Sequence, residues 1–326
     1  MKLSKALRQA ALATVVALAV APTAFANGAK IAIIGGRADD PFFAVVKRGI
    51  DDAARLVKSR GGSVNYLALQ TYDNIGPDAA ALIRTAISQG ATGVAAPDWV
   101  PGAEDSAFEA AKKAGIPILV YNSGGADKAK QLAALNYVGT DESLAGLAAG
   151  EYFAAKGVKN VLCVNTVPGA VNLEARCKGV LDGLAKAGFH SKELPLPASS
   201  FGDPTAVSEA LKATLLRDTT IDGVITMGNQ DANSAAVAIT EASAQQRVKL
   251  GTFNTDQASL DRIKSGTQMF AVDQQGYLQG YLSVFLLDSY VTYGMQSPTT
   301  QILTGPLIVD AANVGTALAG VKAGVR

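Results

Sequence analysis

Residues 38–49 read ADDPFFAVVKRG and place two carboxylates and two aromatic rings at the start of a predicted helix. Asp40 precedes Pro41, which is typical of a helix N-cap followed by the first helical residue. A cap explains one acid but not the two rings. Phe42 and Phe43 cannot both face the core, because neighbouring helical residues point about 100° apart. A hydrogen-bond acceptor beside an exposed ring suits a ligand that has hydroxyls on one side and C–H groups on another.

Polar and aromatic residues also follow most other predicted strands. Each one singly is explained as a helix cap or a turn residue. Caps and turns do not explain donor–acceptor groups at so many strand ends, together with several rings, and the mixture favours a neutral, hydroxyl-rich ligand. These residues are Asp39, Asp40, Phe42, Phe43, Asp98, Trp99, Asn122, Ser123, Thr166, Asn172, Arg176, Ser199, Phe201, Asp203, Asn229, Gln230, Asp231, Asn254, Asp256, Asp273, Gln274 and Gln275.

Patterns typical of catalysis or metal binding are missing from the sequence. It contains no GxSxG, no HExxH and no Cys–His pair. His190 is the only histidine, and we expect it in a solvated turn. Asp39 and Asp40 are adjacent, which is poor geometry for hydrolysis by two carboxylates. We therefore expect no enzyme activity, no cofactor and no metal.

A repeated alternation of strands and helices positions these residues. The strand KIAIIGG precedes a helix whose apolar residues have helical spacing: Phe43, Val46, Ile50, Ala53 and Val57. Nearly continuous apolar strands are typical of a parallel sheet covered on both faces. The pattern restarts after LNYVGTDESLAG without a Pro/Ser-rich linker, so we predict two similar doubly wound α/β lobes hinged closely together. Because ligands bind beyond the carboxyl ends of parallel strands, two facing lobes form a cleft lined by both sets of ends.

Residues 1–26 have the pattern of a cleaved secretory signal. Lys2, Lys5 and Arg8 precede the apolar run AALATVVALAVA, and Ala24-Phe25-Ala26 fits a signal-peptidase site. The apolar run is shorter than the about 20 residues that span a bilayer, and no cysteine marks a lipoprotein. Without those three basic residues, 26 Lys and Arg face 28 Asp and Glu, a net charge of −2. This balance indicates no nucleic-acid partner.

Cys163 and Cys177 are the only cysteines, and export places them in an oxidising compartment. Cys163 lies in a predicted strand and Cys177 in the helix that follows it. A strand and its following helix pack face to face, so a disulfide is geometrically allowed. Two small buried thiols are equally compatible with this placement.

The motifs and their order resemble the type I periplasmic substrate-binding proteins, in the ribose-type sugar-binding branch that serves ABC importers. The resemblance covers essentially the whole mature chain. It rests on DDPFF, AISQGATGVAAP, AAKKAGIPILVYN, VGTDESLAG, ARCKGVLDGL, DGVITMGNQD and AVDQQGYLQGY. It implies a periplasmic monomer whose two lobes hold a sugar and meet at a three-crossing hinge, with a membrane permease and its ATPase as partners. We expect lobe one to comprise residues 27–139 and 275–303, and lobe two residues 140–274 and 304–326.

In lobe one, the resemblance implies ligand contacts from two strand ends. Asp40 stands where the family often has Asn, beside Phe43, the usual stacking ring, with Phe42 as the second choice. Asn122 stands where Asp is frequent and Ser123 where Arg is common.

In lobe two, Arg176 matches the family's arginine, and Phe201 matches a ring over the opposite face of the sugar. Asn229 matches an Asn, Asn254 replaces a common Asp, and Gln274 matches an amide at the crossing.

These departures from the family pattern bear on the ligand. Asn122 and Asn254 remove two negative charges and Ser123 removes a positive one, which questions ribose because charged contacts are the stronger hydrogen bonds. Trp99 is either a partly buried residue of lobe one or a direct contact. Arg176 either pairs with Glu174 or another surface acid, or its guanidinium spans two ligand oxygens.

Other binding functions share this fold. An amino acid would need a charge pair, for which Arg176 with Asp40 or Asp231 is available, and nucleosides or signalling sugars are further possibilities. A sensor or chemotaxis partner would bind the same ligand, and the missing catalytic motifs argue against an exported hydrolase.

Overall fold

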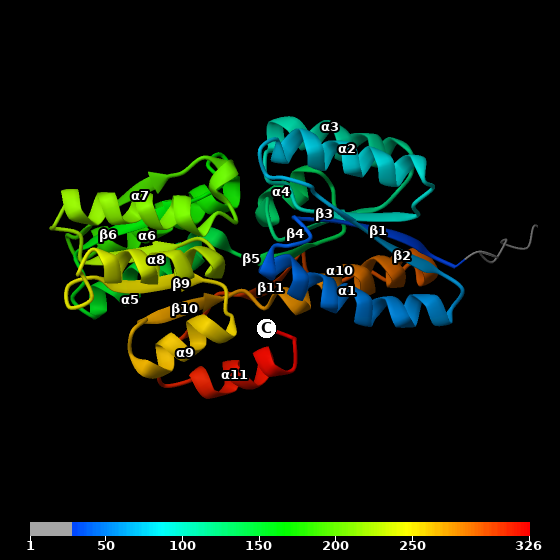
Figure 1. Ribbon diagram of the computed structural model, residues 1–326. Helices are drawn as coiled ribbons and strands as arrows, with labels where there is room; N and C mark the ends of the chain where they lie inside the picture. The colour runs from blue at the N-terminus through cyan, green and yellow to red at the C-terminus, as the bar shows by residue number, and fades with distance from the viewer. Residues whose placement is uncertain (1–27) are drawn as a thin grey trace, which may run out of the picture.

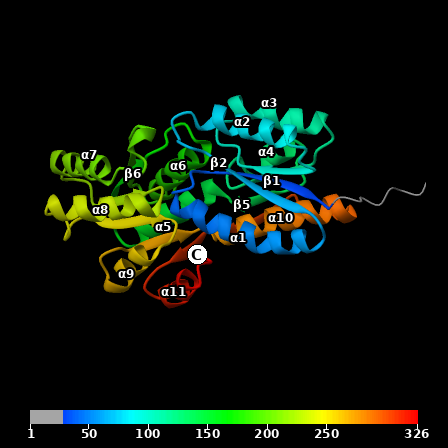
Figure 2. The same ribbon diagram turned by 45° about the vertical axis from the view of Figure 1, so that its right-hand side comes forward.

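The computed structural model describes residues 28–326, so the predicted signal peptide lies outside the described residues. Two six-stranded sheets form two lobes that lie side by side (Figures 1 and 2). The lobe-one sheet has the strand order β11 (Gln301–Gly305), β5 (Tyr137–Thr140), β4 (Ile118–Tyr121), β3 (Gly93–Ala96), β1 (Lys30–Gly35) and β2 (Ser63–Ala68). The lobe-two sheet has the order β12 (Leu307–Val309), β10 (Phe270–Asp273), β9 (Lys249–Phe253), β8 (Gly223–Thr226), β6 (Asn160–Asn165) and β7 (His190–Pro195).

All strand pairs in these sheets are parallel except β10 with β12. The predicted fold of two parallel-sheet α/β lobes is therefore confirmed. One local expectation was wrong: His190 begins the edge strand β7 rather than lying in a turn, although it is exposed as expected.

Helices cover both faces of each sheet because alternate residues of each buried strand point to opposite sides. In lobe one, Ile31 and Ile33 of β1 pack with α1 (Pro41–Ser59) and α10 (Gly276–Tyr293). Ala32 and Ile34 pack on the other face with α2 (Ile75–Ser88), α3 (Pro101–Lys113) and α4 (Gly125–Gln131).

Lobe two repeats this layering. Val161 and Cys163 of β6 face α5 (Glu142–Ala155) and α6 (Val171–Ala185). Leu162 and Val164 face α7 (Pro204–Arg217), which follows the short η1 (Ala198–Ser200), and α8 (Asn229–Glu241). The helices α9 (Gln257–Ser265) and α11 (Val314–Lys322) cover the β10–β12 end of the sheet (Figure 1).

Glycines bring α5 and α6 close together. Gly146 and Gly150 of α5 face Gly179 and Gly183 of α6, so each helix presents two glycines four residues apart. A Cβ at Gly146 would lie 2.2 Å from the carbonyl oxygen of Arg176, well inside van der Waals contact. The two backbones can approach this closely only while neither helix carries a side chain there.

The two cysteines join the same region of lobe two. Cys163 of β6 and Cys177 of α6 form a disulfide, with their Cα atoms 5.8 Å apart. The bridge ties the strand to the helix that carries Arg176.

The chain passes between the lobes three times: after β5 ends at Thr140, between Asp273 and Gly276, and between Gly305 and Leu307. The predicted limits placed the third crossing after residue 303, whereas β11 continues in the lobe-one sheet to Gly305. The lobe limits stay a proposal, with the third crossing at residues 305–307.

Candidate ligand-binding site

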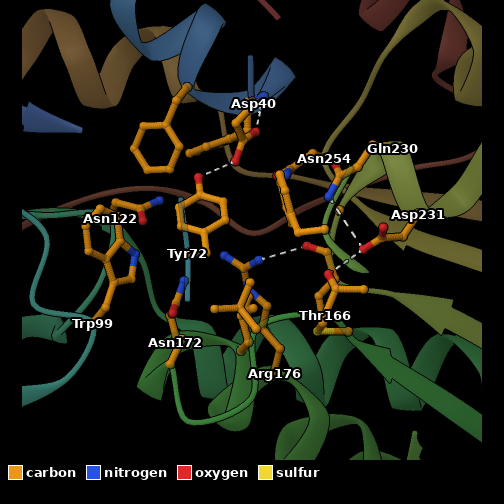
Figure 3. Close-up of a pocket in the computed structure, with 18 of the residues that line it drawn as sticks. Asp40, Tyr72, Trp99, Asn122, Thr166, Asn172, Arg176, Gln230, Asp231 and Asn254 are labelled. Atoms are coloured by element: carbon orange, nitrogen blue, oxygen red, sulfur yellow. Dashed lines mark hydrogen bonds between the residues drawn. The ribbon is translucent and has the colours of Figure 1, made fainter. Parts of the chain in front are cut away.

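A cavity of about 70 Å³ lies between the lobes, at the carboxyl ends of their strands (Figure 3). One water needs about 10–15 Å³ by the same measure, so the cavity suits one small molecule rather than a chain of sugars. It is lined by Asp40, Phe42, Phe43, Tyr72, Ile75, Trp99, Asn122, Thr166, Val167, Ala170, Asn172, Leu173, Arg176, Phe201, Met227, Gly228, Gln230, Asp231, Asn254 and Gln274.

Asp40 is a helix cap that also faces the cavity. Its Oδ1 accepts a hydrogen bond from the Phe42 backbone N–H (2.9 Å), which caps α1. Its Oδ2 accepts one from the Tyr72 hydroxyl (2.7 Å). Burial raises the pKa of Asp40, while these two hydrogen bonds act in the opposite direction. Capping the helix does not exclude a ligand contact. Each carboxylate oxygen has two lone pairs, so each can accept a second hydrogen bond from a ligand.

Aromatic rings from both lobes border the cavity. Phe42 and Phe43 meet edge to face with centroids 5.3 Å apart, and Phe43 meets Trp99 at 5.9 Å. From lobe two, Phe201 meets Tyr72 edge to face at 4.7 Å. Phe43 also packs in the core between β1 and α1, so it serves the core and the cavity together. These rings offer apolar surfaces on more than one side of a ligand.

Asp231 is the corresponding carboxylate of lobe two. Its Oδ2 accepts a hydrogen bond from the Thr166 hydroxyl (2.8 Å). Burial raises the pKa of Asp231 to about 7; the Thr166 hydrogen bond lowers it, and the charge of Asp40 raises it further. Asp40 and Asp231 therefore interact across the cavity.

Arg176 lines the cavity but is held by its own lobe. Its Nε and Nη2 donate to the two carboxylate oxygens of Glu142, at 2.6 and 2.8 Å. Nη2 also donates to Gln274 Oε1 (2.7 Å), and Nη1 donates to the Met227 carbonyl (3.2 Å). The guanidinium lies over the Phe253 ring, 4.6 Å from its centroid.

Of the partners that the sequence offered for Arg176, Glu174 does not bind it, and the acid that does, Glu142, is buried rather than at the surface. Glu174 instead accepts hydrogen bonds from Asn165 Nδ2 (3.3 Å) and the Gly169 N–H (2.8 Å), where it holds the loop before α6. Glu142 begins α5 and lies 34 residues away in the sequence, so no local pattern connects it with Arg176.

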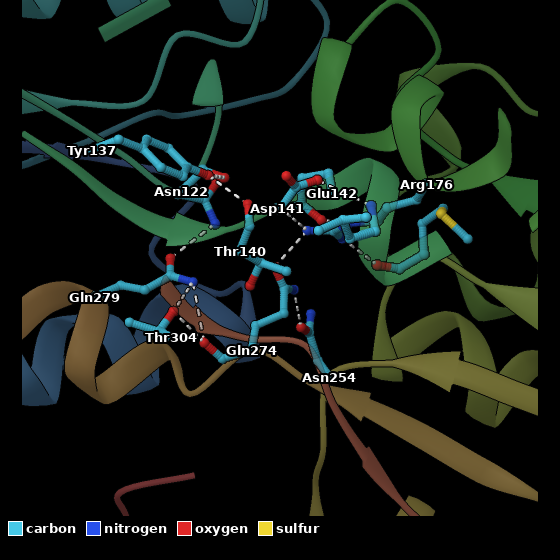
Figure 4. Close-up of polar contacts among 12 residues, drawn as sticks. Asn122, Tyr137, Thr140, Asp141, Glu142, Arg176, Asn254, Gln274, Gln279 and Thr304 are labelled. Carbon is cyan, nitrogen blue, oxygen red and sulfur yellow. Dashed lines mark hydrogen bonds and ion pairs between the residues drawn. The ribbon is translucent and has the colours of Figure 1, made fainter. Parts of the chain in front are cut away.

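Amide side chains connect the cavity to the hinge (Figure 4). Asn122 Nδ2 donates to Gln279 Oε1 (3.2 Å), and Gln274 Nε2 donates to Asn254 Oδ1. Gln279 Nε2 donates to the Gln274 carbonyl (3.3 Å), which also accepts from the Thr304 hydroxyl (2.7 Å). Asn122, Asn254 and Gln274 are thus held near the segments that join the lobes, whereas Asp40, Asp231 and Arg176 are held within their own lobes.

Asn122 and Asn254 occupy equivalent places, directly after β4 and β9. Both have left-handed backbones, with φ of 62° and 67°. Asn tolerates this conformation better than most residues, so the backbone and the cavity both favour Asn there.

Nine of the eleven predicted contacts line the cavity, and two do not. The Ser123 hydroxyl is fully buried and donates to the Asp98 carbonyl (2.9 Å). Asn229 is the first residue of α8; it is buried and does not line the cavity, whereas the next two residues, Gln230 and Asp231, do. We therefore withdraw Ser123 and Asn229 as proposed contacts.

Tyr72 is the main residue that the sequence analysis missed. It follows β2, and it is buried, lines the cavity and binds Asp40. The polar segment QTYDN directly after the strand VNYLAL is the sequence signal that points to it. Thr166, Asn172, Gln230 and Asp231, which the sequence places at strand ends, also line the cavity.

The rims of the two lobes touch. The Val171 N–H of lobe two donates to the Trp99 carbonyl of lobe one (2.9 Å). Arg37 Nη1 of lobe one donates to the Phe201 carbonyl of lobe two (3.1 Å), and its guanidinium lies 5.3 Å from the Phe201 ring centroid. These contacts bring the two rims together beside the cavity, so the lobes are in a closed arrangement.

Two α/β lobes that close over a small polar and aromatic cavity are typical of proteins that capture a small ligand between their lobes. Residues 31–295 match the family model described as a periplasmic binding protein domain. The chain belongs to that family.

Similar proteins support this assignment. A solved carbohydrate transporter from Acidothermus cellulolyticus 11B, in complex with myo-inositol, is 31% identical with a TM-score of 0.82, covering 92% of this chain and 100% of that one. The xylose/arabinose-binding protein of Sulfolobus acidocaldarius is 23% identical over 87% of this chain and 72% of its own length. The D-galactose/methyl-galactoside binding periplasmic protein of Haemophilus influenzae is 25% identical over 76% of this chain and 78% of its own.

No helix among residues 28–326 is long and apolar enough to cross a membrane. Within the same residues, no group of three or more His, Cys, Asp or Glu side chains is placed to hold a metal ion.

Proposed function

We propose that this protein captures a small hydroxyl-rich molecule, a sugar or a cyclic polyol, between its lobes in the periplasm. It then presents the closed complex to the membrane permease of an ABC importer, whose ATPase drives uptake. In this proposal the protein binds its ligand and does not convert it.

The observation that carries the proposal is the cavity itself. Both lobes contribute carboxylates and amides, which can bond hydroxyls, and aromatic rings, which can cover the C–H faces of a ring. The similarity to a protein solved with myo-inositol supports a cyclic polyol or a monosaccharide as the ligand class.

The amino-acid alternative depended on Arg176 binding a carboxylate. Glu142 already takes two of its N–H groups, and Gln274 and the Met227 carbonyl take further ones. A ligand carboxylate would have to compete with a buried ion pair, and this disfavours an amino acid.

A thermal-shift screen of the protein lacking residues 1–26 tests the proposal. The panel comprises pentoses, hexoses, inositols and amino acids, each added at 10 mM or so. A ligand at 100 times its Kd stabilises the folded state by about 2.7 kcal/mol, so at least one sugar or inositol should raise Tm by several degrees. A shift with amino acids alone, or with nothing in the panel, contradicts the proposal.

A further inference from the structure

The cavity contains two carboxylates, and among residues 28–326 no cation that lines it is free to neutralise them. Arg37, at the rim, is paired with Asp39. Asp40 is 7% exposed and Asp231 is 2% exposed. Their hydrogen-bond donors are neutral: the Tyr72 hydroxyl and the Phe42 N–H for Asp40, and chiefly the Thr166 hydroxyl for Asp231. Arg176 is the one cation that lines the cavity, and Glu142 binds it through both carboxylate oxygens.

This arrangement disfavours the charged forms of both acids. Burial raises the pKa of each, and the charge of Asp40 adds to the effect on Asp231. A positive group placed between them would reverse this effect, because an opposite charge nearby favours the ionised carboxylate.

A second, independent feature of the cavity also calls for hydrogen-bond donors. Asn172 Oδ1 is buried and has no hydrogen-bond partner among the described residues, although Asn172 lines the cavity and is only 7% exposed. Asp231 accepts its hydrogen bonds on Oδ2, which leaves Oδ1 available. Figure 3 shows Asp40, Asn172 and Asp231 around the same space, on different sides of it.

Resting on the proposed function, we propose that the cavity selects, within the class of small polyols, those that carry an ammonium group, such as an amino sugar or an aminocyclitol. An ammonium group offers three donors and no acceptor, which suits a cavity whose lining supplies the acceptors Asp40, Asp231 and Asn172 Oδ1. Its single positive charge offsets one of the two negative charges that the ionised carboxylates would carry. Nearby aromatic faces attract a cation as well. The neutral parent polyol makes the same hydroxyl contacts but leaves the charges unbalanced.

Calorimetric titration with matched pairs at pH 7 tests this selectivity. The pairs are glucose with glucosamine, galactose with galactosamine, and scyllo-inositol with scyllo-inosamine. Because hydrogen bonds to charged groups are stronger than neutral ones, we expect the amine of the best-binding pair to bind about tenfold more tightly than its parent.

Two variants locate the effect. Asp231→Asn and Asp40→Asn each remove one charge, and Asn preserves the helix cap at position 40. Each should reduce the preference for the amine to roughly twofold or less. Asp73→Asn is the matched control, because Asp73 is an exposed acid next to Tyr72 in the sequence. This variant should prefer the amine over its neutral parent as strongly as the unaltered protein does.

The outcomes separate this inference from the proposed function. If the neutral member binds as tightly as the amine, or more tightly, in every pair that binds, the ammonium inference is overturned and polyol capture stands. A preference that survives in both Asp variants also overturns it. If neither member of any pair binds, and the wider panel gives no shift, polyol capture itself fails.

Discussion

At the residue scale, Asp231 should make the stability of this protein depend on pH. Burial raises its pKa from the ordinary value of 3.8 to about 7. Between these values the folded state binds more protons than the unfolded state, so the free energy of unfolding falls as pH rises through this window. Asp231→Asn removes this contribution and should stabilise the protein, relative to the parent, by about 2–3 kcal/mol more at pH 8 than at pH 5.

Urea unfolding at the two pH values measures this difference. Other buried acids remain in both proteins, so the comparison isolates Asp231. Asp73→Asn should show no such pH dependence, because its side chain is exposed. The contradicting result is a gain in the free energy of unfolding for Asp231→Asn, relative to the parent, that is the same at pH 5 and at pH 8. It would mean that ionising Asp231 does not destabilise the folded state.

Arg176 should be important for folding as well as for the cavity. Its ion pair with Glu142 is buried, with side-chain exposures of 3% and 7%. Lys keeps the charge but cannot donate to both oxygens of Glu142, to Gln274 and to the Met227 carbonyl in the same geometry. Arg176→Lys should therefore lower the free energy of unfolding by about 1–3 kcal/mol.

The control is Arg55→Lys, which changes an exposed ion pair with Asp52 and should alter stability by less than about 0.5 kcal/mol. Urea midpoints of the two variants can be compared directly. Equal midpoints for Arg176→Lys and the parent protein would contradict the structural role of the Glu142 pair.

The residues that sequence reasoning misplaced have a common physical cause. Asn229 and Asp231 are two positions apart at the start of a helix, so their side chains point about 200° apart. The sequence locates the helix start but not its rotation. Tyr72 depends on Asp40, which is 32 residues away, and no local pattern connects them. Asp40, Phe43 and Asn254 were predictable because they directly follow strands or begin a helix.

At the element scale, the contact between α5 and α6 should tolerate no Cβ at its centre. Helix propensity alone favours Gly→Ala by about 1 kcal/mol. At Gly146, however, the new Cβ would lie 2.2 Å from the Arg176 carbonyl oxygen. Overpacking of this kind costs about 1–3 kcal/mol or more, so Gly146→Ala should destabilise the protein.

Thermal unfolding of Gly146→Ala beside Gly102→Ala tests this contact. Gly102 lies in α3, and a Cβ there meets no atom within 4 Å. The control should be unchanged or slightly stabilised, while Gly146→Ala should have a lower Tm. A rise in Tm for both variants would mean that the helices can separate without cost.

The disulfide between β6 and α6 is a second test at this scale. Protein unfolded without reductant should react with no thiol reagent, and prior reduction should release two thiols. The cysteines are 14 residues apart, and a loop of this length corresponds to at most about 3 kcal/mol of stabilisation. Cys163→Ala/Cys177→Ala should lower stability within that limit. Two reactive thiols in the unreduced, periplasmically expressed protein would contradict the bridge.

Long periodic elements were predictable from the sequence, and short ones were not. The helix α1 was predicted with its buried residues Phe43, Val46, Ile50, Ala53 and Val57, all of which are buried. The seven-residue α4, GADKAKQ, was missed because it has no apolar stripe. The strand β5 has only four residues and lies in the segment LNYVGTDESLAG, where it is too short to show a period of its own.

At the scale of the whole molecule, the account depends on ligand binding between the lobes. The rim contacts of Trp99 with Val171 and of Arg37 with Phe201 close the cavity. The hinge segments hold Asn122, Asn254 and Gln274 in that cavity. Closing the lobes and completing the binding site are therefore the same event in this proposal. The sequence predicted two lobes and a cleft. It could not predict the rim contacts, because Arg37 and Phe201, for example, are 164 residues apart and meet only in the folded chain.

Trp99 makes the central claim directly measurable, because it is the only tryptophan of the sequence and lies 3% exposed in the cavity. Its fluorescence should therefore report on the cavity alone. The measurement is a titration of the protein with myo-inositol, scyllo-inosamine and common monosaccharides. We predict a saturable change in emission, fitting one site, for at least one of them, and a weaker affinity for scyllo-inosamine in Asp231→Asn. An emission that stays constant while calorimetry records binding would place the ligand outside the cleft and contradict the account.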